Sequence, residues 1–199
     1  MGEINNTTLG IHDQWLKIAH LKSDLFIDVG AGLPLSEAWH AKKDWNCRVV
    51  GFEPQLKRYK NLINEPYFDE IYNLALSDSC KVTEYWDCDG MVQKWVNDTQ
   101  KTYSKLCNVV NINLDLFQFE KKYQRIFIWA DIEGMEFEML QGALKLLCSK
   151  QVIGINIETR KKTDKYPNYE MIKTFLFQVG FKPINENQNN KQDIIFISC

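Results

Sequence analysis

Apolar residues along this chain recur in short, nearly continuous runs that are rich in Ile, Val and Phe. These runs occupy residues 25–29, 48–52, 71–76, 126–130, 152–157 and 194–197. Runs of this length without polar alternation are typical of parallel strands that are buried on both faces of a sheet. The pattern therefore predicts strands at these positions, in one largely parallel sheet.

Segments with helical spacing of apolar residues separate most of these runs. They span residues 36–44, 56–64, 135–149 and 168–179. Pro34 precedes the first, where proline suits a helix entry, and Gly180 follows the last, where glycine suits a helix end. Alternating strands and helices predict right-handed crossovers and helices on both faces of the sheet, which makes the fold class α/β.

The C-terminal part of the chain breaks this alternation. Residues 181–184 and 194–197 resemble two strands joined by the polar segment 185–193. A strand, a loop and a strand predict a terminal hairpin, and therefore one antiparallel strand in an otherwise parallel sheet.

Two further segments lie outside this scheme. Residues 13–21 have the pattern of a short amphipathic helix before the first strand, within an N-terminal segment 1–23 that we expect to cap the ligand site. Residues 84–108 form an unusually long connection that carries Tyr85, Trp86, Trp95 and Tyr103. Because 199 residues suffice for one full core, we expect a single domain over 1–199, with 84–108 as an aromatic-rich insertion near the functional edge.

Composition narrows the function classes. The formal net charge of −2 disfavours extended binding to a nucleic-acid backbone. The six cysteines include no C-x-x-C pair, so we expect free thiols rather than a zinc ribbon or a redox motif. The sequence shows no signal peptide, in which a basic segment precedes an apolar one, and no run of about 18 apolar residues. We therefore expect a cytoplasmic chain without a membrane span.

The first candidate motif is L-F-I-D-V-G-A-G at residues 25–32, a strand that ends in Asp28 and opens into Gly30 and Gly32. In an open parallel sheet, ligands bind beyond the carboxyl ends of the strands, and glycine lets the backbone approach them closely. A dinucleotide fingerprint needs a third glycine, but Leu35 stands in its place. The motif alone also fits a tight turn that binds nothing.

Three later motifs close the following strands. Glu53 and Pro54 end G-F-E-P, where a carboxylate can accept hydrogen bonds from both ribose hydroxyls. N-L-A-L-S-D follows at residues 73–78, and I-W-A-D-I-E-G-M-E at residues 128–136. NAD and S-adenosylmethionine both carry that ribose, so Glu53 alone does not separate a dinucleotide from a methyl donor.

Together the four ordered motifs resemble those of the FkbM-type S-adenosylmethionine-dependent methyltransferases, over about residues 24–197. The resemblance implies a class I methyltransferase fold, which is Rossmann-like, with seven strands of which the last is antiparallel. It also implies roles for individual residues. Asp28, Gly30 and Gly32 would shape the site for the amino acid part of S-adenosylmethionine, Glu53 with Pro54 would hold its ribose, and Ala75 with Leu76 would pack near its adenine. Asp131 would stand beside the methyl donor. Trp129 departs from the family, which commonly has Lys two positions before that Asp, and this departure concerns the acceptor side.

Three carboxylates, those of Asp131, Glu133 and Glu158, end the fourth and fifth strands. Methyl transfer needs alignment and a base for the hydroxyl proton, and these carboxylates are best placed as base or orienting groups. Two other interpretations stay open: the three groups bind a divalent cation, or they are ordinary carboxylates at a helix N-terminus. His12, His20 and His40 are the remaining candidate bases.

The leading hypothesis is an O-methyltransferase acting on a hydroxyl of a sugar, glycan or glycosylated metabolite, which is the acceptor class that the resemblance implies. An RNA or nucleotide acceptor is the alternative, with Lys57, Arg58, Lys60 and residues 160–162 as a local basic patch. A third hypothesis is an NAD-binding or non-enzymatic α/β domain. The oligomeric state is not addressed by the sequence.

Overall fold

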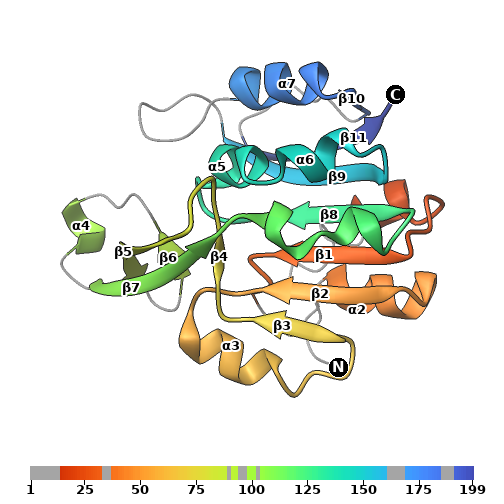
Figure 1. Cartoon of the computed structure of the whole chain (residues 1–199). Helices are drawn as coiled ribbons and strands as arrows, with labels where there is room; N and C mark the ends of the chain where they lie inside the picture. Colours follow the sequence, from red (N-terminus) through yellow and green to blue (C-terminus); the bar gives the residue numbers. More distant parts are fainter. Residues whose placement is uncertain are drawn as a thin grey trace, which may run out of the picture.

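The computed structural model of the chain describes residues 14–32, 37–88, 91–93, 98–101, 104–160, 169–184 and 191–199. Within them, eleven strands form two sheets (Figure 1). The strands are β1 Leu25–Val29, β2 Arg48–Phe52, β3 Glu70–Tyr72, β4 Ala75–Leu76, β5 Lys81–Cys88, β6 Met91–Gln93, β7 Lys105–Ile112, β8 Ile126–Ala130, β9 Val152–Arg160, β10 Phe181–Pro183 and β11 Lys191–Ser198. The helices are α2 Glu37–His40, α3 Leu56–Leu62, α4 Asp98–Lys101, α5 Glu136–Gln141, α6 Leu144–Cys148 and α7 Tyr169–Gln178, with a π-helix η1 Ala41–Trp45 and 3-10 helices η2 Leu114–Phe117 and η3 Phe119–Lys121.

The larger sheet has seven strands in the order β10-β11-β9-β8-β1-β2-β3. The pairs within β9-β8-β1-β2-β3 are parallel, whereas β11 runs antiparallel to both β9 and β10. The predicted α/β class and the terminal hairpin with an antiparallel last strand are therefore confirmed.

Helices pack on both faces of this sheet, as the sequence predicts. In β1, Leu25, Ile27 and Val29 belong to one buried cluster, and Phe26 belongs to the other. This division follows from the two-residue period of a strand. The first cluster is completed by α5, α6 and α7, and the second by residues 14–18, α2 and η1. No helix of the described residues is long and apolar enough to cross a membrane.

The predicted insertion 84–108 contributes most of a second sheet, which the sequence pattern did not predict. Its order is β4-β7-β5-β6, with β5 and β7 antiparallel over seven residue pairs. Figure 1 shows this sheet at the left, on the side to which the arrowheads of β2 and β3 point. Tyr85 and Val109 pack with Met135 of the larger unit in a third buried cluster. The insertion therefore lies beyond the carboxyl edge of the larger sheet.

The strand predicted at residues 71–76 is wrong as one element. It divides into β3, which pairs with β2, and β4, which pairs with β7 of the other sheet. Between them, the side-chain amide of Asn73 donates to the carbonyl oxygens of Glu53 and Pro54, at 2.9 and 3.0 Å. These two bonds fix the chain where it leaves the first sheet.

The single helix predicted at residues 135–149 is also wrong, because α5 and α6 are separated at Gly142. A Cβ on Gly142 would lie 2.0 Å from the carbonyl oxygen of Ser77, so the backbones meet here. The carboxylate of Asp115 accepts hydrogen bonds from the backbone N–H groups of Lys145 and Leu146, both at 2.8 Å. Asp115 thus caps α6 from another part of the chain, and the cap lets a new helix begin there.

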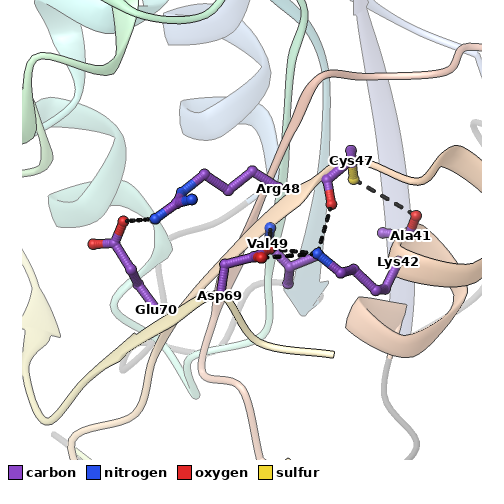
Figure 2. A network of polar contacts seen from close by, with 7 residues as sticks. All are labelled: Ala41, Lys42, Cys47, Arg48, Val49, Asp69 and Glu70. Atoms are coloured by element: carbon purple, nitrogen blue, oxygen red, sulfur yellow. Dashed lines mark hydrogen bonds and ion pairs between the residues drawn. The ribbon is translucent and has the colours of Figure 1, made fainter. Parts of the chain in front are cut away.

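A polar network secures the start of β2, at the end of the sheet opposite the candidate site (Figure 2). Lys42 Nζ lies 2.7 Å from Asp69 Oδ2, and the same oxygen accepts the backbone N–H of Val49 at 2.7 Å. Arg48 pairs with Glu70 beside it. These contacts tie η1 and the segment before β3 to the first residues of β2.

Candidate active site

Two glycines follow β1 and shape the first part of the site. Gly30 and Gly32 have φ angles of +79° and +58°, in the left-handed region that favours glycine. The N–H groups of Gly30 and Ala31 both donate to the carbonyl oxygen of Phe52, at 2.9 and 3.2 Å. The glycine turn is therefore bound to the carboxyl end of β2, where Glu53 follows.

Glu53 lies in this turn as a buried carboxylate. Its Oε2 accepts the N–H of Gly32 at 3.1 Å, and its Oε1 accepts the N–H of Gln55 at 2.7 Å. Burial raises the pKa of the Glu53 carboxyl, while these two hydrogen bonds and the charge of Arg58 act in the opposite direction. Each oxygen keeps a further lone pair, so a carboxylate held in this way can still accept hydrogen bonds from two neighbouring hydroxyls.

Gly30 also contacts the loop after β8. A Cβ on Gly30 would lie 2.1 Å from the carbonyl oxygen of Asp131 and 2.9 Å from Ile132 Cγ2. The N–H of Asp131 donates to the carbonyl of Val29 at 3.1 Å. Two motifs that are about 100 residues apart in sequence thus share one backbone contact, and only glycine fits between them.

The turn after Asp131 is held by the buried carboxylate of Glu136. Its Oε1 accepts the N–H of Gly134 at 3.2 Å and that of Ile132 at 3.4 Å. Glu133 and Gly134 have φ angles of +54° and +100°, so the backbone here needs external support. Burial raises the pKa of Glu136 to about 7.

Asp131 and Glu133 follow the end of β8, and Glu158 lies two residues before the end of β9, which extends beyond the predicted strand. The structure brings these three carboxylates together, as the sequence predicts. One carboxylate oxygen from each lies within 4.8 Å of those of the other two. Burial raises the pKa of the Asp131 carboxyl above its usual range, and the neighbouring carboxylates raise it further, Glu158 most strongly. Asp131 is nevertheless exposed, so solvent reaches it from one side. Three carboxylate oxygens at this spacing can accept a proton, orient a polar ligand or bind a hard cation.

The other predicted site residues lie in β1 and β4, apart from Pro54, which follows Glu53. Asp28 is buried in β1, where it is in register with Gly51 and Trp129. Ala75 and Leu76 form β4: Leu76 is buried in the first cluster, whereas Ala75 packs against the third cluster together with Ile132. The roles predicted for these residues and for Pro54 toward a cofactor stay predictions.

Several earlier candidates do not join the carboxylate group. His40 stacks on Trp15 at 5.4 Å between ring centroids, and His20 is exposed. Trp86 is half-buried in β5. His12, Leu35, Trp95, Tyr103, residues 161–162 and the polar segment 185–190 lie outside the described residues.

Sequence reasoning assigned no role to four residues that shape this edge. They are Asn73, Glu136, Asn156 and Asp193, of which Asn156 and Glu136 are buried polar side chains. Asn73 and Glu136 were visible as members of the quoted motifs. Asn156 gave the clearest signal, because it is the one polar residue inside the apolar run 152–157.

The model of the family described as Methyltransferase FkbM domain matches residues 28–183. No curated protein matches the chain.

Among solved structures, the chain is similar to magnesium protoporphyrin IX methyltransferase from Synechocystis PCC 6803 with bound SAM, at 10% identity and a TM-score of 0.51, over 100% of this chain and 86% of that one. It is similar to an rRNA methylase from Streptococcus thermophilus at 14% identity and a TM-score of 0.51, over 99% of both chains. The methyltransferase domain of bacterial CtHen1 gives 11% identity and a TM-score of 0.50, over 97% of this chain and 100% of that one. At such identities these likenesses establish the fold alone.

Proposed function

This chain belongs to the FkbM family of S-adenosylmethionine-dependent methyltransferases, and we propose that it transfers a methyl group to a hydroxyl of a sugar, glycan or glycosylated metabolite. The proposal divides the carboxyl edge of the larger sheet into two halves. The ends of β1 and β2 bind the donor, and the ends of β8 and β9 face the acceptor.

The observation that carries the proposal is the geometry of Glu53. A buried carboxylate, held by the N–H groups of Gly32 and Gln55, ends the second strand beside a glycine turn. This arrangement suits a ribose, whose two adjacent hydroxyls both need an acceptor. Gly32, whose N–H donates to that carboxylate, carries no side chain that would fill the space next to it. In this proposal Asp28 faces the amino acid part of the donor, and Pro54, Ala75 and Leu76 form the apolar surroundings of its adenine.

S-adenosylmethionine supplies a methyl group on a positively charged sulfur, which keeps the electron pair of the broken C–S bond and becomes neutral. The acceptor hydroxyl oxygen forms the new bond to the methyl carbon and loses its proton. Asp131 accepts that proton and later releases it to solvent, to which it is exposed. Its raised pKa makes it a stronger base than an ordinary aspartate. Glu158 and Glu133 orient the acceptor through hydrogen bonds from its hydroxyls.

A saccharide acceptor fits the chemistry of this edge better than RNA. Carboxylates accept hydrogen bonds from sugar hydroxyls, but they repel the negatively charged phosphate groups of RNA. We also propose that residues 1–199 form one domain, because the third cluster packs Tyr85 and Val109 of the second sheet against Met135, which precedes α5.

The experiment is incubation of the purified chain with labelled S-adenosylmethionine and a panel of free sugars, amino sugars, nucleotide sugars, glycans and short RNA. We expect label in a saccharide, and a loss of about 10²- to 10⁴-fold in the rate with Asp131→Asn. Label in RNA alone would contradict the acceptor class. If turnover stops with a chelator and returns with Mg²⁺, a divalent cation at Asp131, Glu133 and Glu158 replaces Asp131 as the group that activates the hydroxyl.

A further inference from the structure

A row of acidic residues crosses three neighbouring strands of the larger sheet at its carboxyl edge. Asp193 of β11 and Glu158 of β9 are directly paired, and Asp131 follows Ala130, which pairs with Ile157 of β9. We call Asp131, Glu158 and Asp193 the acidic row. Glu37 of α2 stands next to it, since the charge of Asp193 contributes to raising the pKa of Glu37 to about 7, after burial.

Asn156 lies one residue pair beneath this row. Its register partners are Trp129 of β8, two residues before Asp131, and Ile195 of β11, two residues after Asp193. Ile155 and Ile157 face the first cluster, so Asn156 and Glu158 project from the opposite face of β9. The Asn156 side chain therefore projects on the same face as Glu158, at the base of the row.

The amide of Asn156 is fully buried, and neither its Oδ1 nor its Nδ2 has a hydrogen-bond partner among the described residues. A buried polar atom without a partner is costly, and a native chain that keeps one needs a reason for it. An aliphatic residue would fit better between Trp129 and Ile195 if packing were the only demand. The amide is explained if a ligand seated in the row supplies its missing partner.

The charge of the row indicates the chemistry of that ligand. Like charges on adjacent strands repel one another, and a positive group between them relieves the repulsion. An ammonium group offers three N–H donors to carboxylates, and a hydroxyl next to it can both donate to and accept from an amide. A phosphate or carboxylate on the ligand would meet the like charges of Asp131, Glu158 and Asp193.

We propose that the acidic row with Asn156 is the acceptor subsite and that the acceptor is an amine-bearing saccharide, bound as its ammonium form by Glu158 and Asp193. This inference rests on the proposed function and narrows its acceptor class. The ammonium keeps its proton and forms no covalent bond. It positions a neighbouring hydroxyl toward Asp131, which takes the proton of that hydroxyl.

The test is ligand-observed NMR with glucosamine and N-acetylglucosamine, at a pH where the free amine is protonated, on the chain loaded with S-adenosylhomocysteine. The two sugars differ at one nitrogen, which is a charged ammonium in glucosamine and a neutral acetamide in N-acetylglucosamine; the Asp193→Asn variant separates the effect of charge from that of the acetyl group. We expect glucosamine to bind about tenfold tighter, which equals ~1.4 kcal/mol. Asp193→Asn removes this preference, whereas Glu84→Gln, the same loss of charge on the exposed side of β5, leaves it unchanged.

Asn156→Leu separates a ligand-binding role from a packing role. A residue that only fills the core would leave sugar affinity unchanged when replaced. We expect this variant to melt at the same or a higher temperature, because an unpartnered amide is gone, and to bind glucosamine several-fold more weakly.

Equal binding of the two sugars, or a glucosamine preference that survives Asp193→Asn, overturns the inference. Tight Mn²⁺ binding that is abolished by Glu158→Gln also overturns it, because the row would then be a metal site. Failure of the proposed function would be seen separately, as the absence of any heat of binding when S-adenosylhomocysteine is titrated into the chain. In that case the affinities of the two sugars are compared on the chain without S-adenosylhomocysteine.

Discussion

The carbonyl oxygen of Asp131 fills the space next to Gly30 where any other residue would carry its Cβ. The distance from that Cβ position to the oxygen would be 2.1 Å. This contact joins the turn that holds Glu53 to the loop that carries the candidate base. The two halves of the site therefore share one backbone arrangement, and a change at Gly30 reaches both.

Gly30→Ala should destabilise the chain and weaken donor binding together. The substitution adds a steric clash to an unfavourable φ of +79°. Gly180→Ala is the matched control, because Gly180 has a φ of +94° but no atom within 4 Å of its Cβ position. In chemical denaturation, Gly180→Ala should lower the free energy of unfolding by about 1–2 kcal/mol, and Gly30→Ala should lower it by clearly more. Equal losses in the two variants would show that the Asp131 contact is unimportant.

Asp131→Asn should keep the affinity for the donor within a few-fold of the wild-type value, but it should slow the reaction because it removes the base. In the wild type, kcat should fall as the pH drops through the pKa of Asp131, because the protonated carboxyl cannot accept the hydroxyl proton. Burial and the neighbouring carboxylates raise that pKa, so the fall should begin above the usual range of aspartic acid. A pH profile of kcat checks this. A flat profile down to the ordinary aspartate range would remove Asp131 from the mechanism.

Glu136→Gln should change how stability depends on pH. The folded pKa of Glu136 is about 7 and its reference value is 4.5, so the folded state binds more protons than the unfolded state between these values. Stability therefore falls as the pH rises through this window, and the cost is fully present above pH 7. It amounts to about 3 kcal/mol at most. Because glutamine is neutral and its Oε1 can still accept from Gly134, the variant should lose this dependence. The measurement is the free energy of unfolding of both proteins from pH 5 to 8. The same pH dependence in the wild type and in the variant would contradict this prediction.

Asp69→Ala should destabilise the fold without touching the site. The carboxylate of Asp69 accepts the Val49 N–H and pairs with Lys42, both at 2.7 Å and at the far end of β2 from Glu53. Losing it leaves a backbone N–H without its partner and should cost about 1–3 kcal/mol. Donor affinity at a temperature where the variant is folded should match the wild type. A selective loss of donor binding would mean that the two ends of β2 are coupled.

The sequence predicted those parts of the fold that follow from local pattern. The strands predicted at 25–29, 48–52 and 126–130 have the same bounds as β1, β2 and β8. The antiparallel hairpin followed from a polar segment between two apolar runs. Glu53 and Asp131 were found because both end an apolar strand, and such ends meet at one edge of a parallel sheet.

What the sequence did not predict depends on contacts between distant segments. The break between α5 and α6 depends on Asp115, which is 30 residues before Lys145, and on the Ser77 carbonyl against Gly142. The second sheet depends on the pairing of β4 with β7, which joins Ala75 to Asn111. The acidic row needs Asp193 opposite Glu158, a register that only the antiparallel pairing of β11 with β9 creates. No pattern within one segment contains that information.

The most direct test of the account is isothermal titration of S-adenosylmethionine and S-adenosylhomocysteine into the wild-type chain and into Glu53→Ala. Glu53→Gln is the conservative partner, which keeps the shape and removes the charge. The account predicts micromolar or tighter binding of both compounds to the wild type, with affinity reduced by about 10²-fold or more in the alanine variant, because one acceptor group contacts two hydroxyls. No heat of binding with the folded wild type, or equal affinity in Glu53→Ala, would contradict it.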